Sequence, residues 1–220
     1  MNIAIIMPTL RWANWPRVRA NLEAARSPAA QLVWLPVMYH HIRDELTPAQ
    51  LAPLRADWIH PLVLHDEPGV NPIYHKFNAG LNRLAAEDFD GWFYFGADDD
   101  LIPAAFGRKF SQGRPHGVIV ASAKRGQRVT DKGYPTTDLV AAPENMRVGC
   151  VTAGQALLHL RLLHRRRYRH HDCADGMMLE VLYKSAPEEF CFLPDFFLPF
   201  NALEPGRWDE DKLNELLNAN

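Results

Sequence analysis

The feature that most constrains the fold is an alternation of apolar runs with helical segments. The apolar runs lie at residues 2–7, 32–38, 58–64, 91–97 and 117–121. Strands that alternate with helices predict an α/β fold, with a mostly parallel central sheet and helices on both faces. Helix start signals stand between the runs: Asn14-Trp15-Pro16, the capping box of Thr47 with Gln50, and Asn71-Pro72.

The second half of the chain is less regular. Residues 124–147 are polar, with two glycines and two prolines, and predict a long loop. Residues 151–163 are apolar again. We expect a helix over 172–185, a short strand over 190–193 and an amphipathic helix over 208–217.

Composition limits the class of protein. A chain of 220 residues with 47% hydrophobic residues can build one large domain, and its net charge of −2 does not favour a polyanion binder. No stretch approaches the roughly 18 apolar residues that span a bilayer, and the N-terminus lacks the features of a signal peptide. The three cysteines form no CxxC motif, which argues against a disulfide framework or a structural zinc site. We therefore expect a cytoplasmic protein.

Three consecutive aspartates, Asp98, Asp99 and Asp100, follow the aromatic run 91–97. Like charges this close repel one another, and a divalent cation among them would keep them ionised. A ligand set made only of oxygens suits Mg²⁺ or Mn²⁺. Ligands of open α/β sheets bind beyond the carboxyl ends of the strands, where this run is expected to lie. The alternative is a solvated acidic turn in which Asp98 or Asp100 caps the next helix.

Four motifs, in this order, resemble those of family 2-type glycosyltransferases with the GT-A fold. They are a strand that ends in Pro8-Thr9, the helical element Asn78-Ala79-Gly80-Leu81, the aromatic strand with its aspartate run, and Asp175 at a later helix start. The ordered pattern spans roughly residues 2–200. The resemblance implies one GT-A domain over 1–220, with a nucleotide-binding half (1–103) and an acceptor-binding half (104–220).

The resemblance also implies an activity. The chain would be a metal-dependent glycosyltransferase that moves a sugar, with inversion, from a UDP- or GDP-linked donor to a glycan or lipid-linked acceptor. Mn²⁺ or Mg²⁺ on Asp98 and Asp100, or on Asp99 and Asp100 through water, would neutralise the leaving diphosphate.

Asp175 would be the general base that deprotonates the acceptor hydroxyl. Asp172 is its rival, because Ala174 stands where the family usually has a glutamate. A structural alternative is that Asp172 caps the helix and Asp175 interacts with the free N–H groups of its first turn.

Several residues are expected to contact the donor nucleotide. Pro8, Thr9 and Arg11 occupy the position of the family's nucleotide loop, with Arg11 toward phosphate. His40-His41 replaces the family's Asp-Asp-Gly-Ser turn, so Asp66 is expected to serve nucleoside recognition instead. The remaining candidates for nucleotide contact are Lys76, Asn78, Asp98 and Asp99.

A basic run covers residues 161–171. It fits contact with the diphosphate or an anionic acceptor, or a solvated surface turn, whereas nucleic acid is not expected. The resemblance implies a third metal ligand near the C-terminal end, which would be His171, His170 or water. Residues 201–208 fit either acceptor recognition or a C-terminal clasp.

Two other functional classes stay open. A nucleotidyltransferase or phosphohydrolase also needs clustered aspartates and Mg²⁺, but leaves Asp175 unexplained. A non-catalytic nucleotide- or carbohydrate-binding domain on a transferase scaffold would explain Ala174 and the altered turn after the second strand. A Rossmann dehydrogenase is disfavoured because no GxGxxG follows the first strand.

Overall fold

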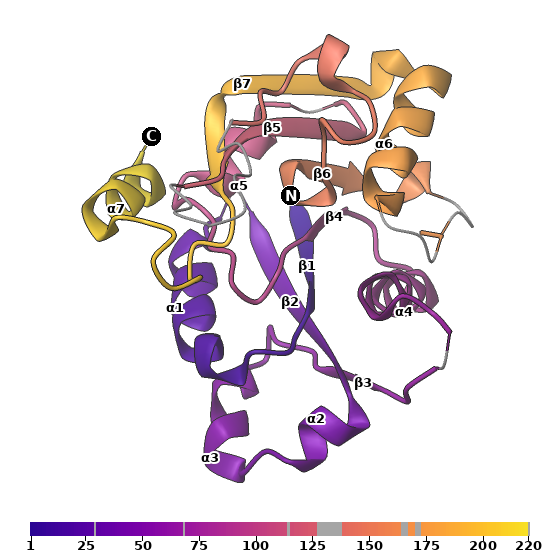
Figure 1. The fold of residues 1–220 in the computed structure, drawn as a ribbon. Coiled ribbons are helices and arrows are strands. Elements are labelled where there is room, and N and C mark those ends of the chain that lie inside the picture. Colours follow the sequence, from indigo (N-terminus) through magenta and orange to yellow (C-terminus); the bar gives the residue numbers. More distant parts are fainter. Residues whose placement is uncertain are drawn as a thin grey trace.

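The apolar runs form a seven-stranded sheet within the described part of a computed structural model (Figure 1). The structure describes residues 1–28, 30–67, 69–113, 115–126, 138–163, 167–169 and 173–219. In sheet order, the strands are β3 (Leu62–Leu64), β2 (Gln31–Tyr39), β1 (Asn2–Pro8), β4 (Trp92–Phe95), β6 (Ala156–His159), β5 (Val118–Lys124) and β7 (Phe190–Pro199).

The sheet is mostly parallel, as predicted. Strands β3, β2, β1 and β4 pair in parallel, and so do β5 and β7, whereas β6 runs antiparallel to both of its neighbours. The carboxyl ends of β1, β2 and β4 therefore meet at one edge of the sheet, which is where ligands bind in open α/β folds. The aspartate run follows β4 at this edge.

Helices cover both faces of the sheet (Figure 1). Alternate residues of β1 point to opposite sides: Ile3, Ile5 and Met7 belong to one core cluster, and Ala4 and Ile6 to the other. The first cluster includes buried residues of α1 (Trp15–Ala25) and α5 (Phe106–Ser111), and the second those of α4 (Pro72–Ala86) and α6 (Ala174–Ser185).

Helix α4 begins at the aspartate edge and returns the chain to the start of β4, and its sequence explains its start and its orientation. The Asn71 side chain accepts a hydrogen bond from the Ile73 N–H at 3.0 Å, and Pro72 opens the helix. Its apolar face, formed by Tyr74, Phe77, Leu81 and Leu84, is buried. Gly80 permits a close approach to β1, because a Cβ atom there would stand 2.5 Å from Cγ2 of Ile6.

The smaller helices are peripheral. The helix α2 (His40–Asp44) follows β2, and α3 (Pro48–Leu51) begins with the predicted capping box of Thr47 and Gln50. The helix α7 (Glu210–Asn218) packs Leu213 against Leu101 and Ala202.

Several expectations differ from the structure. Asn14 does not cap α1 through its side chain; it donates from Nδ2 to the Asp98 carbonyl at 3.0 Å. The run 58–64 yields only the short β3, while β7 extends well beyond the predicted 190–193. Residues 127–137 of the predicted loop lie outside the described residues. In the described part of the chain, no helix combines the length and apolar character that a bilayer span requires.

Candidate functional site

A pocket of about 420 Å³ lies at the aspartate edge of the sheet. The loop after β1, the end of β4, the start of α4, the start of α6 and the segment after β7 contribute to it. It brings together six of the predicted site residues, namely Pro8, Arg11, Asp98, Asp99, Asp100 and Asp175. A larger cavity of about 540 Å³, lined by Phe197 and Trp208, contains none of the predicted site residues. The smaller pocket is therefore the candidate functional site.

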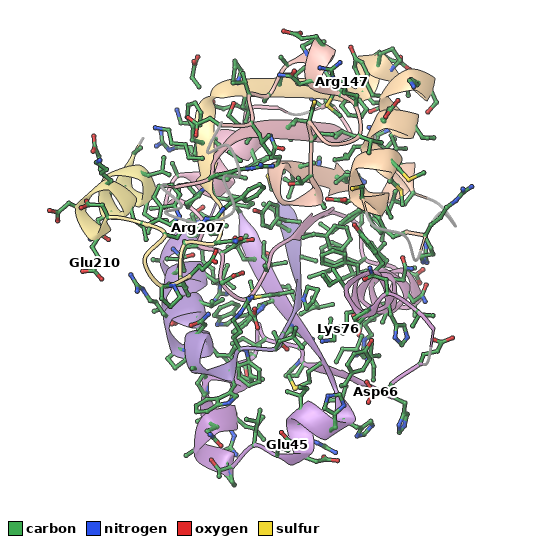
Figure 2. All side chains as sticks on the ribbon, in the orientation of Figure 1. Glu45, Asp66, Lys76, Arg147, Arg207 and Glu210 are labelled. Atoms are coloured by element: carbon green, nitrogen blue, oxygen red, sulfur yellow. The ribbon has the colours of Figure 1, made fainter. Side chains whose placement is uncertain are left out.

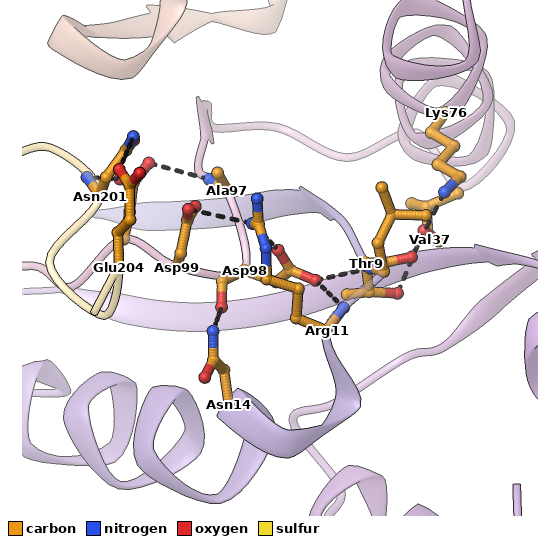
Figure 3. A network of polar contacts seen from close by, with 12 residues as sticks. Thr9, Arg11, Asn14, Val37, Lys76, Ala97, Asp98, Asp99, Asn201 and Glu204 are labelled. Carbon is orange, nitrogen blue, oxygen red and sulfur yellow. Dashed lines mark hydrogen bonds and ion pairs between the residues drawn. The ribbon is translucent and has the colours of Figure 1, made fainter. Parts of the chain in front are cut away.

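Asp98 anchors the loop that follows β1 (Figure 3). Its Oδ2 accepts hydrogen bonds from the backbone N–H groups of Leu10 and Arg11, both at 2.5 Å. Its Oδ1 accepts from Nη1 of Arg11 at 2.9 Å. The side chain is almost fully buried, so these three bonds balance its charge and fix the loop against the end of β4.

Asp100 is held from two directions. Its Oδ2 accepts from the Ala97 N–H at 3.0 Å, and its Oδ1 from the Asn201 N–H at 2.7 Å. Burial, and then the charge of Asp99, raises the pKa of Asp100 to about 7, although the two backbone hydrogen bonds oppose this shift. The segment after β7 thus forms a clasp over the aspartate run, one of the two predicted uses of residues 201–208. The Leu203 N–H completes it by donating to the Asp99 carbonyl at 2.8 Å.

Asp99 faces Arg11. Its Oδ2 lies 3.0 Å from Nη1 of Arg11, the same atom that contacts Asp98. Burial raises the pKa of Asp99, Arg11 opposes the rise, and Asp98 adds to it. Burial also works against the Arg11 cation, but the charges of Asp99 and Asp98 outweigh it and raise the pKa of that guanidinium. One guanidinium therefore serves two neighbouring carboxylates.

The chemistry of this donor set fits a hard divalent cation. Three carboxylates stand beside one guanidinium, and burial, with repulsion between the neighbouring charges, raises the pKa of Asp99 and of Asp100. In the described residues, however, no three His, Cys, Asp or Glu side chains are already arranged around a cation position. The three carboxylates differ in their partners: both oxygens of Asp98 and of Asp100 accept hydrogen bonds, whereas Asp99 contacts Nη1 of Arg11 through Oδ2.

Asp175 also lines this pocket. Its Oδ1 accepts from the Tyr74 hydroxyl at 3.0 Å, and its Oδ2 from the Ala153 N–H at 2.9 Å. The structural alternative placed Asp172 at the N-cap of this helix and Asp175 beside the free N–H groups of its first turn, and Asp175 does lie in that turn. Cys173 is the N-cap of α6, and the carboxylate of Asp175 contacts Ala153 of a different segment. Asp172 and His171 lie outside the described residues.

Four other predicted residues lie apart from this pocket. Thr9 is fully buried and donates from Oγ1 to the Val37 carbonyl at 3.2 Å. Asn78 uses both polar side-chain atoms on the backbone of Tyr168, at 2.8 Å each. Their roles at the nucleotide remain predictions.

The other two lie near the ends of β2 and β3. Asp66 is exposed and pairs with Nδ1 of His41 at 2.7 Å. Lys76 is buried, with Nζ 3.3 Å from the Thr9 carbonyl oxygen and 4.5 Å from the centre of the Tyr39 ring. Burial lowers the pKa of Lys76, while the charges of Asp98 and Asp66 oppose the shift. Figure 3 shows Lys76 reaching from α4 toward Thr9. Figure 2 shows Asp66 and Lys76 in the same part of the molecule.

Two arginines of the basic run form hydrogen bonds with other side chains of the protein. Arg161 donates from both terminal nitrogens to Glu189, at 3.0 and 2.7 Å. Arg167 donates from Nε to Oδ1 of Asn82 at 2.7 Å. Residues 164–166 and 170–171 of the run lie outside the described residues.

Sequence reasoning missed two contributors to the site. Tyr74 was not among the predicted site residues, and its hydroxyl reaches Asp175. The backbone of Ala153 completes the carboxylate contacts. The chain offers no local signal for either, since the partners are 101 and 22 positions apart.

Comparison with solved structures supports the fold. The chain is similar to S. aureus TarS 1–349, with a TM-score of 0.59 and 14% identity over 90% of this chain and 59% of that one. It is also similar to the mannosyltransferase PcManGT from Pyrobaculum calidifontis in complex with GDP-Man and Mn²⁺. That match has a TM-score of 0.58 and 15% identity, and covers 93% of this chain and 58% of the other. The chain thus spans less than two thirds of these two proteins.

A third similar structure is the inositol-1-phosphate CTP transferase from T. maritima. Its TM-score is 0.50 and its identity 11%, over 99% of this chain and 95% of that one. No family model and no curated protein sequence matches the chain. The fold is therefore shared with glycosyltransferases and a nucleotidyltransferase. The sequence identities of 11–15% show a common architecture and nothing more.

Proposed function

We propose that this chain is a glycosyltransferase that uses a nucleotide-diphosphate sugar, with Mn²⁺ or Mg²⁺, and inverts the sugar it transfers. One observation carries the proposal: Asp175 and the aspartate run line the same pocket, at the carboxyl edge of a mostly parallel sheet. The structure of TarS in complex with UDP-GlcNAc, which resembles this chain with a TM-score of 0.58, supports the same class of donor.

The aspartate run would receive the diphosphate end of the donor. Asp99, together with Asp98 and Asp100, would hold the cation, which supplies Lewis-acid stabilisation of the leaving diphosphate when bound. Asp98 fixes the loop that carries Arg11, and the guanidinium would contact the same phosphates. Asp100 is held by Ala97 and Asn201, which keeps the run in place.

Asp175 would act as the general base. Tyr74 donates to one oxygen and Ala153 to the other, so the carboxylate has a fixed orientation and retains lone pairs for an acceptor hydroxyl. Removal of that proton as the hydroxyl attacks the anomeric carbon contributes typically 10²–10⁴-fold to such a reaction. A single displacement of this kind inverts the configuration of the sugar.

The nucleoside would lie toward the ends of β2 and β3. Pro8 lines the pocket and Thr9 follows it, while Lys76 and Asp66 offer a buried cation and an exposed carboxylate nearby. Through these groups the chain would bind UDP or GDP. The acceptor would be a glycan or a lipid-linked saccharide that enters on the Asp175 side.

Calorimetric titration tests this function. UDP and GDP are titrated into the wild type with Mn²⁺, with Mg²⁺ and with EDTA, and into Asp98→Asn/Asp100→Asn. Asp195→Asn is the matched control, because Asp195 is exposed, lies within β7 and does not line the pocket. We expect metal-dependent binding of one nucleotide by the wild type and the control, and loss of binding by the double variant. Binding that ignores both metal and the double substitution would contradict the proposal.

A nucleotidyltransferase is the second candidate, because the CTP transferase match covers nearly all of both chains. The two functions release different products. A nucleotidyltransferase given a nucleoside triphosphate and a sugar phosphate releases pyrophosphate, whereas a glycosyltransferase given a nucleotide sugar releases the nucleoside diphosphate. Assays of both products on the same preparation distinguish them, and retained activity in Asp175→Asn would favour the nucleotidyltransferase.

A further inference from the structure

We propose that Arg11 and the divalent cation compete for the same carboxylate oxygens, so that the cation binds together with the nucleotide diphosphate and only weakly before it. The inference deepens the proposed function and rests on it for the identity of the nucleotide. It concerns the order in which the site is filled, which Arg11 determines.

The first argument is the position of one nitrogen atom. Nη1 of Arg11 lies 2.9 Å from Oδ1 of Asp98 and 3.0 Å from Oδ2 of Asp99 (Figure 3). A cation shared by these two oxygens would need to approach each to about 2.0–2.1 Å for Mg²⁺. The guanidinium and the cation cannot occupy this gap together, so one must leave before the other enters.

The second argument is that the guanidinium can leave while the loop stays. The backbone N–H of Arg11 is held by Oδ2 of Asp98, a contact that does not depend on the side chain. The Arg11 side chain is 55% exposed. In the described part of the chain, its ion-pair partners are Asp98 and Asp99, and the charge of Glu204 adds a smaller attraction. The side chain can therefore exchange partners without unfolding of the loop.

The third argument is the charge balance. Without nucleotide, a cation that displaces Arg11 breaks both ion pairs and leaves the guanidinium beside the cation with only the smaller attraction of Glu204 to oppose the repulsion. A diphosphate offers a new anionic partner for Arg11 and further oxygens for the cation. Nucleotide and cation should therefore bind with positive coupling, and each should raise the affinity for the other by the same factor.

The experiment measures Mn²⁺ binding without nucleotide, from the spectrum of free Mn²⁺ in electron paramagnetic resonance. It uses the full chain as wild type, Arg11→Gln, Arg11→Lys and the control Arg17→Gln, an exposed arginine on α1. We expect Arg11→Gln to bind Mn²⁺ about 10-fold more tightly than the wild type, within the usual 5–150-fold range of such couplings. Arg17→Gln should match the wild type, and Arg11→Lys, which keeps the charge, should stay close to it.

A second titration repeats the measurement with saturating UDP or GDP. The nucleotide should raise the Mn²⁺ affinity of the wild type more than that of Arg11→Gln, and adding Asp99→Asn to Arg11→Gln should abolish the tight site. Equal Mn²⁺ affinity of wild type and Arg11→Gln, or weaker binding by the variant, overturns the competition. Thermal melting of each variant verifies that it is folded.

The two proposals fail separately. If the wild type binds UDP or GDP but Arg11→Gln shows no gain in Mn²⁺ affinity, the competition is wrong and the proposed function stands. If Arg11→Gln gains Mn²⁺ affinity while no nucleotide binds to any variant, the competition for the carboxylates is supported and the proposed nucleotide is wrong.

Discussion

The hydroxyl of Tyr74 donates a hydrogen bond to Asp175 at 3.0 Å, across 101 positions of the chain. Tyr74 stacks on Tyr168 with 5.8 Å between ring centres, so its hydroxyl is aimed from a packed aromatic cluster. Burial, with the charge of Asp175, raises the pKa of Tyr74 far above its ordinary value, which keeps it a hydrogen-bond donor at every working pH. The candidate base is thus oriented by a neutral phenol.

Tyr74→Phe should lower kcat for sugar transfer about 10-fold and leave the KM for the donor unchanged, because it releases the orientation of Asp175 without touching the diphosphate end. Steady-state kinetics with a donor and acceptor found by screening measure this. Tyr183→Phe is the control, since Tyr183 packs on Phe190 and Phe192 along α6, away from the pocket. A rise in KM with constant kcat would show that Tyr74 contributes to binding instead.

Asp98→Asn should destabilise the fold by about 1–3 kcal/mol even without any ligand, because the part-buried N–H groups of Leu10 and Arg11 lose a buried, charged acceptor. Urea unfolding in EDTA measures it, with Asp195→Asn as the exposed control. An unchanged unfolding midpoint would mean that Asp98 does not anchor the loop.

Lys76→Met should weaken UDP or GDP binding about 10-fold, because Lys76 is proposed to contact the nucleotide. The free energy of unfolding should stay within about 1 kcal/mol of wild type. The Lys76 ammonium is buried and its pKa is lowered by that burial, so the fold gains little from its charge. Calorimetry and urea unfolding check the two parts, with exposed Lys212→Met as control. Full nucleotide affinity in Lys76→Met would assign the lysine a structural role.

Glu189→Gln should show a pH-dependent loss of stability. Hydrogen bonding to Arg161 lowers the pKa of Glu189, so the unfolded state binds its proton more readily than the folded state. The stabilisation is present above the unfolded pKa of about 4.3 and is lost as the pH falls through the lower folded value.

At pH 7 the variant should be less stable than wild type by a few tenths to about 1 kcal/mol, because solvent screens the pair. The difference should shrink toward zero below about pH 4. Urea unfolding across pH measures it, and exposed Glu188→Gln should show no such trend. A difference that persists at low pH would assign the effect to the Gly117 contact alone.

Most of the architecture followed from local patterns. The apolar runs marked β1, β2 and β4, and Asn71-Pro72 marked the start of α4, because strand alternation and helix capping depend on neighbouring residues. The capping prediction was wrong for Asn14, because its side-chain amide donates to the Asp98 carbonyl and makes no hydrogen bond to the first turn of α1. The reversed direction of β6 had no local signal, since direction depends on which strands flank it.

The sequence by itself determined the order of strands and helices and the place of three aspartates at a strand end. Only the tertiary structure decided what each aspartate does: Asp98 anchors Leu10 and Arg11, Asp99 shares the guanidinium, and Asp100 is held by Asn201. These contacts join residues 87–101 positions apart. Identical side chains differ here because each one's charge is balanced by groups that only the folded sheet edge brings within hydrogen-bond distance.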